Sequence, residues 1–357
     1  MKAMETNGIE NLNVAAFDAI LTPEQMHALL PVSDKAAHAV RMGRKQLEDI
    51  LTRKDKRLFV IVGPCSIHDT AAGFDYAQRL FALSQKVKDS MLLVMRVYFE
   101  KPRTSVGWKG FVNDPHLDDS FCIAEGMQRA RKFLLEVAEL GLCAAAEALD
   151  PISPQYLGGL LSWSAIGART TESQTHREMA SGLSTPVGFK NSIDGNTEST
   201  VNALLAGMRP HSFLGINAQG LASIVRTKGN PHCHVVLRGG QNGPNYSAAH
   251  MAHMEAALQK AGLPCNIVVD CSHANSQKNH LLQPLVFADC LQQRLQGNTS
   301  LVGLMVESFL EEGNQPLPRD LSLLRYGQSI TDACIGWQRT EDMLLEAHDK
   351  LLSSQRP

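Results

Sequence analysis

The chain has 357 residues, of which 44% are hydrophobic and 20% charged, and its formal net charge is −2. This composition, with no low-complexity tract, excludes disordered and fibrous proteins and supplies enough apolar residues for a large core. Lys and Arg are spread along the chain, which argues against nucleic acid as a partner.

Membrane proteins and disulfide-rich proteins are excluded by the distribution of apolar residues and cysteines. Residues 1–8 lack the charged and then apolar pattern of a signal peptide, and no apolar run approaches the roughly 18 residues of a membrane span. Eight cysteines are scattered without a CxxC pair, which indicates reduced, mostly buried thiols. We therefore expect a cytoplasmic protein with no membrane partner.

Residues 1–55 precede the first predicted strand and contain two helix starts, Thr22-Pro23-Glu24 and Ser33-Asp34. This pattern predicts an N-terminal helical extension. It would either cover the bottom of the domain that follows or serve assembly and regulation.

From residue 56 onward, short apolar runs alternate with longer amphipathic segments. The runs are nearly continuous, which is typical of strands buried on both faces of a parallel sheet. Eight strands are predicted, at 59–65, 92–99, 142–147, 165–169, 187–190, 234–238, 267–273 and 301–307. The predicted helices include 121–139, 173–181, 248–261, 278–296 and 332–352.

Eight strands each followed by a helix predict an α/β fold, a closed (β/α)8 TIM barrel, rather than an open doubly wound sheet. No GxGxxG follows the first strand, which removes the usual dinucleotide-binding interpretation. Two short runs joined by a Gln-Gly turn predict an inserted β-hairpin at about 211–228, outside the barrel. The sequence thus predicts an extension, 1–55, and a catalytic TIM-barrel domain, 56–357.

Residues suited to metal or anion chemistry stand at or just after the end of every predicted strand. In chain order they are Cys65, Arg96 with Lys101, Glu147, Arg169, Lys190, Arg238, His273 and Glu307. The carboxyl ends of barrel strands share one face, which is where barrel enzymes have their active sites. Read singly, each of these residues could be a core residue or a surface ion pair, but their joint placement favours a site.

Four of the residues at this face form a mixed set of metal ligands. Cys65, His273 and Glu307, with Asp332 after the last long loop, offer a thiolate, an imidazole and two carboxylates. This mixture suits one divalent ion such as Mn, Fe, Co or Zn better than Ca or Mg, which prefer oxygen ligands.

The same face carries six cations, Arg96, Lys101, Arg103, Arg169, Lys190 and Arg238. Two phosphate monoesters and a carboxylate carry roughly −4 to −5 at neutral pH, if each phosphate carries about −1.5 to −2. The cations therefore suit a pair of phosphorylated substrates.

At these residues the chain resembles the class I 3-deoxy-D-arabino-heptulosonate 7-phosphate (DAHP) synthases, the entry enzymes of the shikimate pathway. The matching segments span nearly the whole chain. They are Gly63-Pro64-Cys65-Ser66-Ile67-His68-Asp69, the run 95–104, the run 167–173, Gly188-Phe189-Lys190-Asn191, Leu237-Arg238-Gly239-Gly240, the run 270–276, Val306-Glu307-Ser308 and the run 330–334.

The resemblance implies roles for individual residues. Cys65, His273, Glu307 and Asp332 would bind the metal ion, with Asp332 also beside the substrate. The phosphoenolpyruvate site would consist of Arg96, Lys101, the main chain of Ala168, Arg169, Lys190 and Arg238, with Glu147 beside it. The erythrose 4-phosphate site would consist of Lys101, Pro102, Arg103 and Thr104, with Arg103 and Thr104 on the phosphate.

The resemblance also implies the reaction, a condensation of phosphoenolpyruvate with D-erythrose 4-phosphate. The metal ion would activate the aldehyde as a Lewis acid. Lys101 is the candidate proton donor, with a pKa shifted by Arg96 and Arg103, although a metal-bound water or His273 could take that role.

Regulation by an aromatic amino acid is a further implication. The run 146–153, with Gly215-Ile216-Asn217, resembles the tyrosine-sensitive subgroup, because the phenylalanine-sensitive one tends to carry Phe where Ala148 stands. By analogy Pro151, Gln155, Leu183 and Ser184 would line the effector pocket, unless they are ordinary packing. Family members are commonly homo-oligomers, so we expect a dimer or tetramer.

Two alternatives compete with this function. A 3-deoxy-D-manno-octulosonate 8-phosphate synthase would use the same donor and fold, but its usual Lys-Ala-Asn-Arg-Ser-Ser run is absent, and Lys101-Pro102-Arg103-Thr104 stands there instead. A catalytically idle regulatory homologue would have a damaged ligand set, and the set here is intact.

Overall fold

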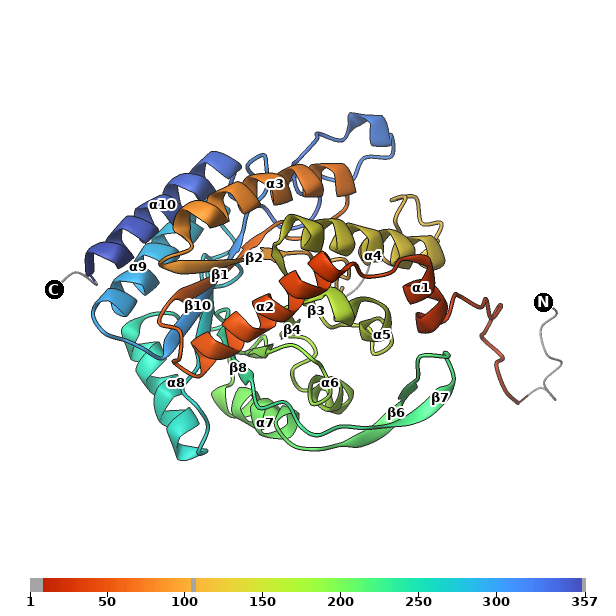
Figure 1. Cartoon of the computed structure of the whole chain (residues 1–357), viewed down its shortest axis with the longest axis horizontal. Coiled ribbons are helices and arrows are strands. Elements are labelled where there is room, and N and C mark those ends of the chain that lie inside the picture. Colours follow the sequence, from red (N-terminus) through yellow and green to blue (C-terminus); the bar gives the residue numbers. More distant parts are fainter. Residues whose placement is uncertain (1–8, 104–106, 355–357) are drawn as a thin grey trace.

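The computed structural model describes residues 9–103 and 107–354. Within them, eight parallel strands form a closed barrel in the order β1-β10-β9-β8-β5-β4-β3-β2 (Figure 1). The strands are β1 Leu58–Gly63, β2 Met91–Arg96, β3 Cys143–Glu147, β4 Trp163–Ile166, β5 Val187–Lys190, β8 Cys233–Leu237, β9 Ile267–Asp270 and β10 Leu301–Glu307. The predicted TIM barrel is confirmed.

Helices surround the barrel, and at least one follows each strand along the chain. They are α1 Pro23–Leu29, α2 Asp34–Leu51, α3 Thr70–Val87, α4 Ile123–Leu140, α5 Pro154–Leu157, α6 Gln174–Ala180, α7 Thr197–Gly207, α8 Ala248–Lys260, α9 Gln283–Leu295 and α10 Trp337–Ser354. Residues such as those of β1, all buried, therefore face helices on the outside and packed side chains on the inside.

Several predicted boundaries were wrong at the carboxyl ends of strands and at the starts of helices. The strands predicted to reach 99 and 273 end at Arg96 and Asp270. The helix predicted from 278 begins at Gln283, because Gln277 and Lys278 adopt left-handed backbone conformations, with φ of 54° and 61°. Likewise α10 begins at Trp337, not at Asp332. In each case the residues outside the element form the loops of the site.

The N-terminal extension covers the amino end of the barrel. Both predicted helix starts are confirmed, since Thr22 caps α1 in a capping box and Ser33 caps α2. The α2 residues Leu47, Ile50 and Leu51 pack in one cluster with inward side chains that begin the strands, including Phe59, Leu92 and Trp163. The helix thus closes the floor of the barrel.

Two buried side chains at this floor form a neutral hydrogen bond. Trp163 Nε1 donates to His234 Nε2 over 3.0 Å, and His234 Nδ1 lies 3.0 Å from the carbonyl oxygen of His232. With Nε2 as acceptor, Nδ1 carries the proton and donates it to that carbonyl. Burial lowers the pKa of His234 to about 4, so the ring stays neutral near pH 7.

The predicted hairpin lies outside the barrel. Its strands, β6 Ser212–Ile216 and β7 Ala222–Arg226, pair antiparallel with each other only, within the described chain (Figure 1). The tip approaches the N-terminal extension, where Glu24 N–H donates to the Ala218 carbonyl oxygen over 2.8 Å. Leu214 and Ile224, which lie opposite each other on the two strands, are 84% and 62% exposed.

Among the described helices, none is both long and apolar enough to cross a membrane.

Candidate active site

The strand-end residues meet in a cavity of about 400 Å³ at the carboxyl end of the barrel. Twelve predicted site residues line it: Arg96, Lys101, Pro102, Arg103, Glu147, Ala168, Arg169, Lys190, Arg238, His273, Glu307 and Asp332. Cys65 is buried directly behind the wall, with its Sγ 3.2 Å from Lys101 Nζ. Thr104 lies outside the described residues.

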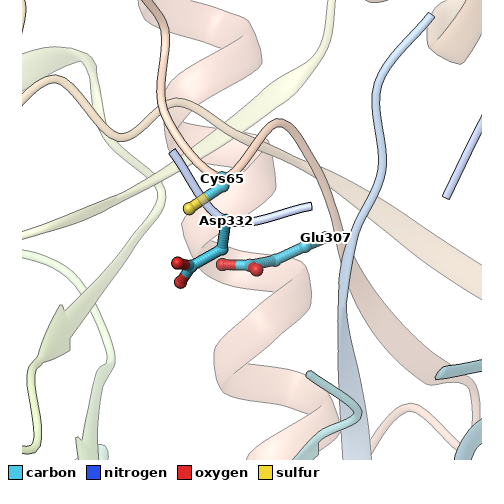
Figure 2. A group of neighbouring side chains, drawn as sticks. All are labelled: Cys65, Glu307 and Asp332. Carbon is cyan, nitrogen blue, oxygen red and sulfur yellow. The ribbon is translucent and has the colours of Figure 1, made fainter. Parts of the chain in front are cut away.

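A thiol and two carboxylates gather at one side of this mouth (Figure 2). Cys65 follows β1, Glu307 ends β10, and Asp332 lies in the loop before α10. One ligand atom of each lies within 4.8 Å of the others. Because β1 and β10 are paired neighbours, with Gly63 opposite Glu307, the fold itself brings the first two together.

His273, the fourth residue of the predicted set, lies in the loop after the adjacent strand β9. Its Nε2 lies 4.0 Å from Glu307 Oε1, and its Nδ1 lies 3.8 Å from Asp332 Oδ2. The backbone of His273 is left-handed, with φ of 55°, an uncommon conformation for a residue with a side chain. This turn directs the chain back across the mouth after β9.

These donors fit a divalent ion of borderline character. One sulfur and two carboxylates converge here, and the His273 imidazole lies beside both carboxylates. Such mixed sets favour Zn, Fe, Co or Mn over Ca or Mg. Burial and the neighbouring Glu307 raise the pKa of the Cys65 thiol, against the opposing effect of Lys101. A bound cation would supply the positive charge that favours the thiolate.

Arg96 is a buried cation that borders this ligand set. It is 1% exposed, donates to Glu307 Oε1 over 2.8 Å and to the Pro64 carbonyl oxygen over 3.0 Å. Its guanidinium carbon lies 3.7 Å from the centre of the Tyr98 ring. Lys101 Nζ and Lys190 Nζ lie 5.8 and 6.0 Å from the same ring, so Tyr98 offers its face to three cations.

The residues that set the pKa of Lys101 differ from those predicted. Its burial and Arg96 act to lower the pKa, as cationic neighbours should, but Cys65, Glu307 and Asp332 outweigh them and the pKa is raised. The predicted effect of Arg96 is present, but the acidic ligand set reverses the net shift. Lys101 therefore carries its proton at neutral pH.

Lys190 is held by a residue that the sequence predictions missed. Its Nζ lies 2.7 Å from Asp270 Oδ2, and both side chains are buried. Burial alone would raise the pKa of Asp270, but Lys190 and His273 hold it well below the usual range. The motif around His273 contains Asp270, yet nothing in its spacing marks this carboxylate as a partner of β5.

Other lining residues were also missed. They include Tyr98, Ser272, Ser276, Lys278, His280, Gln283, Asn314 and Thr331. With Lys278, seven cationic side chains line this cavity in the part of the chain that the structure describes, and three acidic ones do, Glu147, Glu307 and Asp332. Glu147 Oε1 is buried without a hydrogen-bond partner within the described chain, so it is available to a ligand or a water molecule.

A second cavity, of about 270 Å³, lies beside the first. Three of the four predicted effector residues, Gln155, Leu183 and Ser184, line it together with Ala148. The fourth, Pro151, does not line it, and Pro154 does, because the chain turns into α5 at that point. Glu147, the last residue of β3, lines both cavities, so they are adjacent at the end of this strand.

Comparison with known proteins identifies the family. Residues 30–345 match the model of the DAHP synthetase I family. The chain belongs to this family. It is 51% identical over 348 residues to the Tyr-sensitive phospho-2-dehydro-3-deoxyheptonate aldolase of Escherichia coli (strain K12), a match that covers 98% of each chain.

Two further relatives refine the comparison. Identity to the Phe-sensitive enzyme of the same organism is also 51%, over 335 residues, covering 94% of this chain and 95% of that one. A solved phospho-2-dehydro-3-deoxyheptonate aldolase from Francisella tularensis SCHU S4 has a TM-score of 0.94 and 42% identity, covering 96% of this chain and 100% of that chain. The predicted family is confirmed, whereas identity alone does not separate the two effector subgroups.

Proposed function

We propose that this chain condenses phosphoenolpyruvate with D-erythrose 4-phosphate and water to give DAHP and phosphate, the first step of the shikimate pathway. The observation that carries the proposal is the meeting of a mixed metal-ligand set with seven cations in one cavity. Membership of the DAHP synthetase I family supports the same reaction.

The cations would bind both substrates as anions. Arg96, Lys101, Arg169, Lys190 and Arg238, with the main chain of Ala168, would hold phosphoenolpyruvate. Pro102 and Arg103, with Thr104, would hold erythrose 4-phosphate. An excess of cations over acids in a partly buried cavity strengthens each contact with phosphate, since water screens it less than at the surface.

Cys65, His273, Glu307 and Asp332 would hold one divalent ion, Mn, Fe, Co or Zn. When bound, the ion would supply Lewis-acid polarisation of the aldehyde oxygen. Glu307 ends β10, Cys65 and His273 lie within three residues of the ends of the neighbouring strands β1 and β9, and Asp332 lies in a loop, so the barrel places three of the four close together.

The condensation forms one carbon–carbon bond and one carbon–oxygen bond, from water to C2, and it breaks the carbon–oxygen bond from C2 to phosphate. C3 of phosphoenolpyruvate attacks the aldehyde carbon, and the aldehyde oxygen accepts the displaced electron pair and a proton. Lys101 Nζ, which is protonated at neutral pH, is our candidate donor. Water adds at C2 and loses a proton. The bond from C2 to the phosphate oxygen then breaks, inorganic phosphate leaves, and the new C2 hydroxyl loses its proton to become the ketone.

Regulation, assembly and location belong to the same proposal. The small Ala148 at the second cavity leaves room for a larger ring, which supports tyrosine as the effector.

The exposed apolar residues include Leu12, Phe17, Leu214 and Ile224. They support a homo-oligomer, a dimer or tetramer, in which the N-terminal arm or the hairpin is covered. The cytoplasmic location stays a prediction.

The test mixes the purified protein with phosphoenolpyruvate and erythrose 4-phosphate and follows the loss of enol absorbance and the release of phosphate. We expect turnover that a chelator abolishes and that Mn, Fe, Co or Zn restores. A parallel assay replaces erythrose 4-phosphate with arabinose 5-phosphate. Preference for the second sugar, or no turnover with any of the four ions, would refute the proposal.

A further inference from the structure

Asp270 lies between the proposed phosphoenolpyruvate site and the proposed metal site. It is the last residue of β9 and has no exposed surface. Its Oδ2 lies 2.7 Å from Lys190 Nζ and 3.3 Å from His273 Nε2. Its Oδ1 accepts hydrogen bonds from Ser272 N over 3.1 Å and from Ser272 Oγ over 2.6 Å.

The contacts of this carboxylate divide into two groups. Through Oδ1, Asp270 is fixed to its own loop. Through Oδ2, it contacts a residue of the anion site, Lys190, and a residue of the metal-ligand set, His273. Asp270 is not among the described residues that line the cavity. It must therefore act through Lys190 and His273 and not by touching substrate.

We propose that Asp270 is a positioning residue that links the anion site to the metal site. One oxygen sets where the Lys190 ammonium and the His273 ring lie relative to each other. The inference rests on the proposed function, because that function assigns Lys190 to phosphoenolpyruvate and His273 to the ion.

There is a physical reason why Asp270 should affect both His273 and Lys190. A carboxylate partner orients a metal-binding imidazole and makes it more basic, and loss of such a partner typically weakens metal binding about 10- to 100-fold. On the other side, β5 delivers Lys190 to the wall, but only Asp270 forms an ion pair with its Nζ within the described chain. A displaced ammonium binds its anion less well, because contact strength falls with distance.

The decisive variant is Asp270→Asn, which keeps the shape of the side chain and removes its charge. The full-length protein is stripped of metal with a chelator and titrated with Mn²⁺ alone by calorimetry. We expect the Kd for Mn²⁺ to rise about tenfold or more. In steady-state assays the KM for phosphoenolpyruvate should rise about tenfold, while that for erythrose 4-phosphate changes less than about threefold.

Two matched variants separate positioning from a general loss of stability. Leu47→Ala, at the floor of the barrel, should lower the unfolding temperature with less than about a threefold change in the Kd for Mn²⁺. Asp349→Asn removes an exposed carboxylate of α10 and should change neither quantity. If Asp270→Asn does not fold, Asp270→Glu keeps the charge, displaces the oxygens and should shift both constants in the same direction.

A folded Asp270→Asn variant with an unchanged Kd for Mn²⁺, an unchanged KM for phosphoenolpyruvate, or tighter phosphoenolpyruvate binding would overturn the inference. Tighter binding would mean that Asp270 only neutralises Lys190. If the unaltered protein binds no Mn²⁺ or does not form DAHP, the proposed function fails and this inference fails with it. The two failures are therefore distinguishable.

Discussion

The two ends of the barrel bury polar groups in opposite ways. At the carboxyl end, Arg96, Glu307, Lys190 and Asp270 are charged and form ion pairs with one another beside a cavity. At the amino end, Trp163 and His234 share a neutral hydrogen bond beneath the α2 side chains. The same eight strands connect both ends, so the difference comes from the side chains at the strand ends and from what covers them, the α2 helix at the floor and the loops at the mouth.

This difference indicates that the carboxyl end of the barrel serves function and the amino end serves stability. Buried charges are costly, and replacing them with apolar groups is often neutral or stabilising, so a cluster of them is weak evidence for a role in holding the fold. The floor, by contrast, buries the apolar face of α2 against the strand starts, which is a direct source of stability. Changes at the mouth should therefore alter binding, and changes at the floor should alter unfolding.

The largest expected effect is at the mouth. Cys65→Ser replaces the proposed thiolate ligand with a hydroxyl, a much poorer ligand for borderline ions. We expect metal affinity and activity to fall together by roughly 100-fold or more, with little change in the unfolding midpoint of the metal-free protein. Metal titration and steady-state kinetics would measure this. Full activity would remove Cys65 from the metal site.

The second largest expected effect is a loss of stability at the floor of the barrel. Leu47 is fully buried where α2 meets the strand starts, so Leu47→Ala should lower the free energy of unfolding by about 2–5 kcal/mol. Urea unfolding measures this loss. Below the unfolding transition, KM for both substrates should match the unaltered protein, and a shifted KM would show that the two ends are coupled.

A smaller effect should appear as a dependence of stability on pH. The pKa of His234 falls from an ordinary value of 6.5 to about 4 in the folded state. The unfolded chain therefore binds the proton first, and His234 contributes stability above pH 6.5 that is lost as the pH falls toward 4, roughly 3 kcal/mol in all. Urea unfolding at several pH values would measure this slope. In His234→Gln the slope over this window should flatten, and an unchanged slope would assign it to other groups.

The smallest effect concerns the second cavity. Ala148→Phe would fill part of its 270 Å³, so we expect the tyrosine concentration for half-inhibition to rise about tenfold with kcat unchanged. Inhibition curves with tyrosine and with phenylalanine would measure this change. Equal tyrosine sensitivity in the variant would argue against this cavity as the effector site.

The sequence predicted the barrel because its strands are buried on both faces and appear as continuous apolar runs. It also predicted most of the mouth, since barrel topology brings strand ends together whatever their separation in the chain. Asp270 and Tyr98 were missed because their importance depends on which neighbours they contact across strands. Pro151 does not line the second cavity, whereas Pro154, the first residue of the four-residue helix α5, does, and the sequence pattern does not separate these two prolines.

The hairpin has a consequence for handling the protein. A closed barrel leaves no strand edge free, whereas the two strands β6 and β7 pair only with each other in the described part of the chain. Together with the exposed Leu214, Leu221 and Ile224, these open edges favour aggregation wherever a partner subunit does not cover them. Leu214→Lys would place a charge on that face, so it should keep concentrated samples in solution if the hairpin is free and weaken the oligomer if the hairpin is covered.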